Sequence, residues 1–190
     1  TGNGGITKGV PSKILTLTRT GLNDVERLLN EDELLPYELD PHKIKQDFLR
    51  HGLYAQKVTA NVMGSEKFIG FQTEKEIQRI AESGVKQHDV IWHIGNARIG
   101  VEIELTAKWN RPFDQFIIGC AQSISSGTVN QLFLISDAPA IIKRYKQALT
   151  GGNQIPRWVQ NKKRFWEING SFTLPEGIER KVLCQEFKDY

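Results

Sequence analysis

The sequence predicts an α/β domain in which helices flank a mixed central sheet, and three local patterns support this fold class. Residues 89–94 and 98–105 are two strand-like segments joined by a Gly-Asn pair, a two-residue hairpin signal of the glycine-first kind. Residues 112–125 carry apolar side chains at helical spacing. Residues 131–135 are almost entirely apolar, as expected for a strand that is buried on both faces beside a parallel neighbour.

The beginning of the chain predicts a separate piece of structure. Residues 13–18 alternate like a strand, and a helical stretch through Val25 and Leu28 follows. A strand that leads into a helix in this way is similar to the end of a winged-helix DNA-binding domain. We therefore predict that residues 1–35 are the remnant of such a domain with its linker, and that residues 36–190 form the main domain. The alternative is a hairpin strand that packs on the main domain.

The remaining elements follow from capping and turn signals along the chain. In chain order they are a helix from Asp40-Pro41 to about His51, strands at residues 54–63 and 68–71, a helix that opens with a capping box at residues 73–76, a helix that Asp137 caps, and edge strands at residues 166–168 and 181–184. The strand at residues 131–135 and the helix that follows Asp137 complete a strand–helix–strand–helix unit. Such a unit favours parallel neighbours in the sheet.

Composition and charge are those of an ordinary soluble domain. Hydrophobic residues make up 39% of the chain and charged residues 25%, which is a normal globular balance. No apolar run has the length of a membrane span and no signal peptide opens the sequence, so we expect a cytoplasmic protein. Cys120 and Cys184 lie far apart and lack zinc-ligand spacing. A net charge of +3 is compatible with nucleic-acid binding without requiring it.

Three carboxylates are predicted to converge on one face of the central hairpin. If the Gly-Asn pair forms the turn, Asp89 lies directly opposite Glu102, and Glu104 lies two positions along on the same face. Acids this close would repel one another, and a divalent cation would remove the repulsion because Mg²⁺ and Mn²⁺ prefer oxygen ligands. Lys108 follows within four residues and would stabilise developing phosphate charge. The alternative is the solvated polar face of an ordinary hairpin.

The order of these elements resembles the core of PD-(D/E)xK nucleases, a restriction-endonuclease-like fold. Residues 102–108, Glu-Ile-Glu-Leu-Thr-Ala-Lys, are similar to a Glu-x-Glu-Leu-Thr-x-Lys signature of replication-relaxation proteins and MobC/TraX-type plasmid mobilisation relaxases. Residues 51–56 and 71–76 are similar to blocks that precede that signature. The resemblance covers residues 13–149, including the tail of the winged-helix domain.

The resemblance implies a metal-dependent DNA endonuclease, a relaxase that nicks one strand at a plasmid transfer origin during conjugative mobilisation. The implied partners are DNA at that origin, accessory mobilisation proteins and a coupling protein. Asp89 and Glu102 would be metal-binding catalytic acids, joined by Glu104, with Mg²⁺ or Mn²⁺ as cofactor. Glu104 stands where the common motif has lysine and His88 where it has proline, and Lys108 is the substitute cation.

Several residues outside the acids are further candidates for the site. Glu74, on the preceding helix, would be an auxiliary acid, and Gln122, on the following helix, faces either the site or the solvent. His93 shares the strand face of Asp89 and either lines the site or is packed and hydrogen-bonded. Trp109 either stacks on a base or sugar or packs in the core. The residues of a phosphate-contacting surface, or of a merely solvated charged face, are Arg157, Lys162, Lys163 and Arg164.

Two other functions remain open at this point. A non-catalytic DNA-binding accessory or replication protein with a nuclease-like fold is favoured by the glutamate in the lysine position of the motif. A restriction or repair nuclease of the same fold is the other alternative. The sequence has no Gly-x-Ser-x-Gly motif and no His-hydrophobe-His triplet, so it predicts neither a serine hydrolase nor a tyrosine-dependent relaxase.

Overall fold

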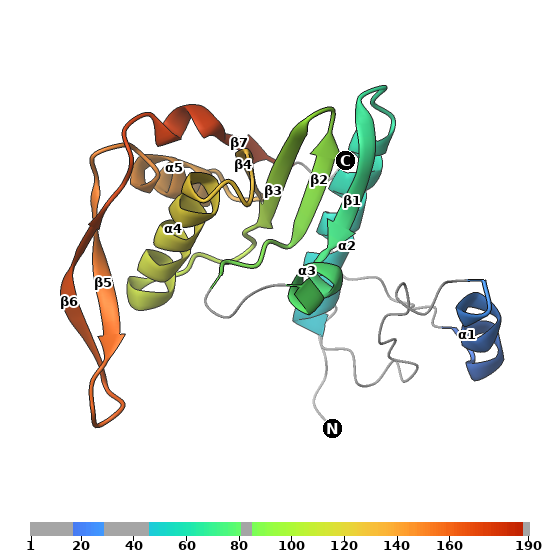
Figure 1. Ribbon diagram of the computed structural model, residues 1–190, viewed down its shortest axis with the longest axis horizontal. Coiled ribbons are helices and arrows are strands. Elements are labelled where there is room, and N and C mark those ends of the chain that lie inside the picture. The colour runs from blue at the N-terminus through green and yellow to red at the C-terminus, as the bar shows by residue number, and fades with distance from the viewer. Residues whose placement is uncertain (1–16, 29–45, 81–84, 188–190) are drawn as a thin grey trace. The chain divides into compact units, whose positions relative to one another are not determined.

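The structure is a computed structural model that describes residues 17–28, 46–80 and 85–187 (Figure 1). The chain divides into two compact units, Thr1–Val58 and Thr59–Tyr190. The second unit contains the sheet and the predicted site.

In the first unit, α1 (Arg19–Glu26) is a short helix that Thr18 caps. The Thr18 hydroxyl oxygen accepts a hydrogen bond of 3.1 Å from the backbone N–H of Gly21, which satisfies one N–H group of the first helical turn. The strand predicted just before this helix falls mostly on residues 13–16, which lie outside the described residues, as does the helix start predicted at Asp40. The winged-helix remnant therefore stays a prediction.

The strand predicted over residues 54–63 is wrong, because this segment is the C-terminal part of α2 (Gln46–Met63). Tyr54 and Val58 lie four residues apart and are both buried, which is the spacing of one helical face. The β-branched Val58, Thr59 and Val62 favour a strand by propensity. The burial of a helical face outweighs that weaker local preference.

The second unit contains a five-stranded sheet with the strand order β1-β2-β3-β4-β7. Neighbouring strands are antiparallel from β1 to β3, whereas β4 runs parallel to β3 and β7 runs parallel to β4. The bounds of these strands are β1 (Phe68–Thr73), β2 (Val90–Ile94), β3 (Ala97–Ile103), β4 (Gln131–Ser136) and β7 (Val182–Glu186). The predicted α/β class and the predicted mixed central sheet are therefore confirmed.

The hairpin of β2 and β3 has the predicted register. Ile94 pairs with Ala97 next to the turn, and Val90 pairs with Val101 at the other end of the ladder. Gly95 occupies the first turn position with φ of 53°, a conformation that side-chain-bearing residues rarely adopt. The backbone N–H of Asp89 donates to the carbonyl of Val101 at 3.1 Å and so extends the ladder toward the predicted acids.

The capping box predicted after β1 is also confirmed. It opens α3 (Glu74–Ile80), where the Glu76 side chain accepts a 2.6 Å hydrogen bond from the backbone N–H of Thr73. In return, the Thr73 hydroxyl accepts a 3.4 Å hydrogen bond from the N–H of Glu76.

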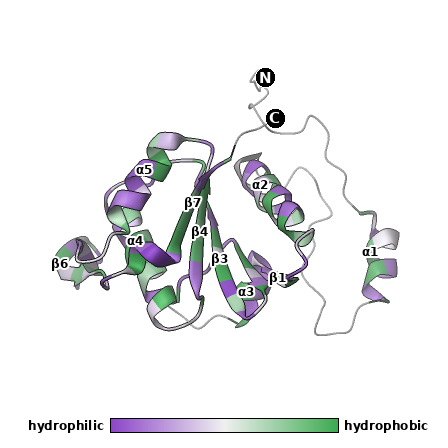
Figure 2. Ribbon diagram, turned by 90° about the horizontal axis from the view of Figure 1, so that it is seen from above, coloured by the Kyte–Doolittle hydropathy of each residue, from purple (hydrophilic) through white to green (hydrophobic). Residues whose placement is uncertain are grey.

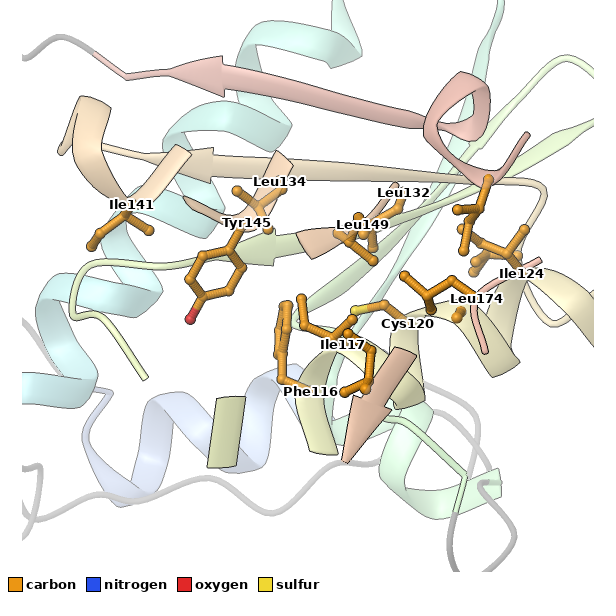
Figure 3. Packing of buried hydrophobic residues seen from close by; sticks show 14 of the residues in the cluster. Phe116, Ile117, Cys120, Ile124, Leu132, Leu134, Ile141, Tyr145, Leu149 and Leu174 are labelled. Atoms are coloured by element: carbon orange, nitrogen blue, oxygen red, sulfur yellow. The ribbon is translucent and has the colours of Figure 1, made fainter. Parts of the chain in front are cut away.

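The main hydrophobic core lies between the sheet and two helices, α4 (Asn110–Ser125) and α5 (Pro139–Ala148), on the same side of the sheet (Figures 1 and 2). Figure 2 shows β4 as mostly hydrophobic along its length, as its buried position requires. Figure 3 shows how the two helices and β4 pack together, and its buried residues include Phe116, Ile117, Cys120, Ile124, Leu132, Leu134, Tyr145 and Leu149. The apolar helical stripe predicted for α4 thus faces the core.

β5 (Gln154–Gln160) and β6 (Trp166–Thr173) form a separate antiparallel pair, which we call the β5–β6 ribbon. The edge strand predicted at residues 166–168 belongs to this ribbon and not to the main sheet. The other predicted edge strand is β7, which follows a 3₁₀ turn, η3 (Ile178–Lys181). In the described part of the chain, no helix has the length and apolar character needed to cross a membrane.

Candidate functional site

Glu102, near the end of β3, is the centre of a buried polar cluster. Its side chain is 2% exposed, and its Oε1 atom lies 2.6 Å from Nζ of Lys86 and 2.6 Å from Nδ1 of His88. His88 is also buried, and its Nε2 atom lies 2.7 Å from the hydroxyl of Ser123 on α4. One carboxylate oxygen therefore serves two nitrogen groups, and the imidazole links β3 to α4.

Two glycines make room for the side chains that reach Glu102. A Cβ atom at Gly100 of β3 would lie 2.8 Å from the His88 ring, closer than any normal contact. A Cβ atom at Gly119 of α4 would lie 3.2 Å from Cβ of Lys86. A glycine inside a strand or helix costs about 0.5–1 kcal/mol relative to alanine, so both positions accept a local penalty to accommodate the cluster.

The chain of hydrogen bonds from Ser123 through His88 to Glu102 has the order of a serine-hydrolase triad. All three side chains are at most 2% exposed, and Ser123 lies on the inner face of α4. A nucleophile must be reached by its substrate, so we assign this chain of residues a structural role.

Glu104 is the centre of a second buried cluster. It is 2% exposed and forms an ion pair with Lys108, and its Oε2 atom accepts a 3.0 Å hydrogen bond from the hydroxyl of Tyr145. The Phe116 ring lies close to both clusters, with Nζ of Lys86 at 5.1 Å and Nζ of Lys108 at 4.7 Å from its centroid. Each buried glutamate thus has its own lysine, and both ammonium groups lie close to one aromatic ring.

Burial shifts the protonation equilibria of these clusters. Burial by itself would lower the pKa of Lys86, but the Glu102 carboxylate in contact with it outweighs this effect and raises that pKa. Burial raises the pKa of Glu104 above its usual range, although the ion pair with Lys108 and the hydrogen bond from Tyr145 act in the opposite direction. Lys86 therefore stays charged, and the pKa of Glu104 lies above that of an ordinary glutamate.

The raised pKa of Glu104 predicts a pH-dependent effect of Glu104→Gln. In the folded wild type this group binds a proton more tightly than in the unfolded chain, so its contribution to stability is lost as pH rises from about 4.5 through the folded pKa. Glutamine does not titrate. We therefore expect the free energy of unfolding of the variant, relative to wild type, to improve between pH 4 and pH 7. Urea denaturation at each pH measures this difference, and a difference that stays constant between pH 4 and pH 7 would contradict the assignment.

The three predicted metal ligands, Asp89, Glu102 and Glu104, each have protein partners in the structure. Oδ2 of Asp89 accepts a 2.7 Å hydrogen bond from the backbone N–H of Ile103, and the two glutamates direct oxygens to lysines. Within residues 17–28, 46–80 and 85–187, no group of three or more His, Cys, Asp or Glu side chains could hold a metal ion. The lysines supply the positive charge that the sequence analysis assigned to Mg²⁺ or Mn²⁺, so the residues as arranged do not fit a divalent cation.

The predicted auxiliary residues lie at different places. Glu74 is exposed at the start of α3, where it accepts a 3.0 Å hydrogen bond from the side chain of Gln78. His93 is half-buried and pairs with Arg98 near the hairpin turn, four residues along β2 from Asp89. Four residues of a strand span about 13 Å, so His93 does not reach the acids.

A surface hollow of about 370 Å³ lies beside the Glu102 cluster. It brings together two of the predicted residues, Gln122 of α4 and Arg157 of β5, with Lys86, Gln115 and Trp158. Lys86 thus contacts both the buried carboxylate and this hollow. Glu102 balances the positive charge of Lys86, and Asp114 accepts a 2.8 Å hydrogen bond from the Trp158 indole.

Basic and aromatic side chains meet on the surface of α4, α5 and the β5–β6 ribbon. The guanidinium carbon of Arg144 lies 3.9 Å from the ring centroid of Trp109, and that of Arg111 lies 4.2 Å from the centroid of Trp166. Trp109 is 65% exposed, so it does not pack in the core. The exposed basic residues predicted as a phosphate surface, Arg157, Lys162, Lys163 and Arg164, all lie on the ribbon.

Sequence reasoning missed several of these positions. Lys86 lies in an irregular segment before β2 and carries no motif, and the roles of Ser123 and Tyr145 depend on contacts across the fold. Gly100 offered a usable signal, because a glycine inside a strand often marks a close approach by another group. No protein-family model matches this chain, and neither the curated proteins nor the solved structures contain a significant match to it.

Proposed function

We propose that the second unit, Thr59–Tyr190, binds DNA through the basic and aromatic side chains of α4, α5 and the β5–β6 ribbon. The observation that carries this proposal is the exposed ribbon, on which residues 154–173 contain four basic residues and one acid, Glu167. Nucleic-acid affinity rests largely on lysine and arginine contacts to phosphates, so such a local excess of positive charge favours a polyanionic partner.

The aromatic partners of the arginines strengthen the proposal. Arg144 lies over the exposed ring of Trp109, and its Nη1 atom donates a 2.9 Å hydrogen bond to the carbonyl of Lys108. Arg111 lies over Trp166 in the same way. A guanidinium group that is held on an aromatic ring loses less conformational freedom when it binds a phosphate, and the exposed rings offer stacking surfaces for bases.

The salt dependence of DNA affinity tests this proposal. Each phosphate contact adds about 0.9 to the slope with which log K falls as log salt concentration rises. The variant Lys162→Gln, Lys163→Gln, Arg164→Gln should therefore bind DNA more weakly, and its slope should be smaller by about 2–3. Fluorescence anisotropy with a labelled 30-base-pair duplex measures both. The variant Lys67→Gln, Lys75→Gln, Arg79→Gln removes equal charge from the β1 side of the unit and should retain the slope. Equal effects of the two variants, or no binding by wild type, would contradict the proposal.

A second candidate function is metal-dependent nicking of one DNA strand, as in the plasmid relaxases that residues 102–108 resemble. The hairpin register favours it, because position 89 lies opposite position 102, where PD-(D/E)xK nucleases are expected to carry their acids. The lysine contacts of Glu102 and Glu104 disagree with a bound divalent cation, so we derive no catalytic step through a metal.

A plasmid-nicking assay decides between binding alone and cleavage. Supercoiled plasmid with a transfer origin is incubated with the protein in Mg²⁺ or Mn²⁺, with EDTA as the negative control. The variant Asp89→Asn retains an oxygen that can accept the hydrogen bond from Ile103, and exposed Asp24→Asn is the matched control. Nicking that requires metal and is lost only in Asp89→Asn would support the nuclease candidate. Plasmid that is bound but never nicked would reject it and leave DNA binding as the function.

A further inference from the structure

We propose that the β5–β6 ribbon contacts duplex DNA by entering the major groove with its turn first. This inference rests on the proposed DNA binding and names the form of DNA and the groove. The ribbon's outer half is built from the pairs Trp158–Ile168, Val159–Glu167 and Gln160–Trp166, and it ends in a turn from Asn161 to Phe165. All of β6 except Phe172 is exposed, so the ribbon offers β6 and its turn to a partner.

The turn is held in one conformation by its own hydrogen bonds. Oδ1 of Asn161 accepts hydrogen bonds of 3.0 Å from the backbone N–H groups of Lys163 and Phe165. The backbone N–H of Asn161 donates to the carbonyl of Phe165 at 2.9 Å, and that of Arg164 donates to the carbonyl of Asn161 at 2.8 Å. Such a preorganised turn presents its side chains at a lower entropic cost on binding than a loose loop would.

The side chains that the turn presents suit the edges of base pairs in the major groove. Lys162, Lys163 and Arg164 are all exposed there. Arginine and lysine are the usual donors to the O6 and N7 atoms of guanine, and the exposed ring of Phe165 can contact a thymine methyl group. The same cations also attract backbone phosphates on either side of the groove.

The size of the ribbon distinguishes the two grooves. Its strands lie about 4.8 Å apart, and their side chains extend further on both sides. The major groove of B-DNA is about 12 Å wide and admits a two-stranded ribbon, whereas the minor groove is about 6 Å wide. The strands are therefore too broad for an undeformed minor groove.

The outer half of the ribbon is fixed to α4. The indole N–H of Trp158 donates a 2.8 Å hydrogen bond to Oδ2 of Asp114, and Arg111 lies over the ring of Trp166. Both contacts join the ribbon to the first half of α4, so the turn has a defined direction relative to the basic and aromatic surface of the helix. Phosphate contacts by Arg111 and Arg144 then lie on the same side of the unit as the inserted turn.

A duplex with a filled major groove tests the inference. Wild-type affinity is measured by anisotropy for two 30-base-pair duplexes of the same sequence, one with ordinary cytosines and one with glucosylated hydroxymethylcytosines, which fill the major groove and leave the minor groove open. We expect glucosylation to weaken binding at least about fivefold, the effect of losing one good base contact. The variant Lys162→Gln, Lys163→Gln, Arg164→Gln should bind the two duplexes equally. Distamycin, a minor-groove ligand, should not compete.

The outcomes separate this inference from the proposed function. Equal wild-type affinity for both duplexes, or competition by distamycin, would overturn major-groove entry while leaving DNA binding intact. Absence of binding to either duplex would overturn the proposed function itself. The groove modification acts on the DNA, so this result does not depend on whether the protein variant folds.

Discussion

Glu102→Ala is expected to lower the free energy of unfolding of the second unit by about 3–5 kcal/mol, the usual effect of removing one member of a buried ion pair. Oε1 of Glu102 is the acceptor for Nζ of Lys86 and lies 2.6 Å from Nδ1 of His88. Alanine leaves a half-buried ammonium group and a buried imidazole without this partner. Glu102→Gln keeps an acceptor oxygen and loses only the charge, so it should cost less, about 1–3 kcal/mol.

Urea denaturation followed by circular dichroism measures the effect of Glu102→Ala. The matched control is Glu66→Ala, because Glu66 is an exposed acid in the turn before β1 and its removal should change stability by less than about 0.5 kcal/mol. Similar unfolding midpoints for the two variants would show that Glu102 is not the acceptor on which the cluster depends. A large effect would also mean that loss of DNA cleavage in Glu102→Ala cannot by itself identify a catalytic acid.

Gly100→Ala is expected to lower the free energy of unfolding by about 2–4 kcal/mol, although it adds only one methyl group. The new Cβ atom would lie 2.8 Å from the His88 ring. That ring cannot move aside cheaply, because its nitrogens lie 2.6 Å from Glu102 and 2.7 Å from the Ser123 hydroxyl. A shift that relieves the clash therefore breaks at least one buried hydrogen bond.

A control and a double-mutant cycle make the Gly100 prediction specific. Gly70, in β1, has no atom within 4 Å of an added Cβ, so Gly70→Ala should be neutral or slightly stabilising. In a His88→Ala background the clash disappears, and Gly100→Ala should then cost less than about 1 kcal/mol. If Gly100→Ala costs the same with and without His88, its effect comes from the strand backbone and not from the imidazole.

The two clusters determine whether Glu102 and Glu104 are available to a metal ion. In nuclease-like sites, acids at the end of a hairpin are available to a metal, whereas here Glu102 and Glu104 are buried and each contacts a lysine. A bound divalent cation would have to compete with Lys86 for Oε1 of Glu102. The exposed ribbon and the paired arginines do not depend on that competition, which is why DNA binding is the proposed function and cleavage the second candidate.

The centre of the fold could be predicted from the sequence, because the hairpin, α4 and β4 depend on local interactions. The Gly-Asn turn and the alternation of residues 98–105 set the register of β2 and β3, and with it the position of Asp89 opposite Glu102. The spacing of apolar residues predicted α4, and an apolar run predicted β4. Turn conformation and side-chain periodicity are properties of short segments, so they can be predicted without knowledge of the rest of the chain.

The partners of the buried charges could not be predicted from the sequence, because they depend on contacts between distant segments. Three acids near one hairpin predicted a bound metal cation. The chain itself supplies two positive charges instead, from Lys86 in an irregular segment and from Lys108 after β3. The destination of a long, flexible side chain depends on the space that distant residues leave for it, as Gly119 does for Lys86. The same applies to residues 54–63, where β-branched side chains predicted a strand and burial of one helical face produced α2. Long-range packing therefore decided both the chemistry of the acids and the elements with weak local preference.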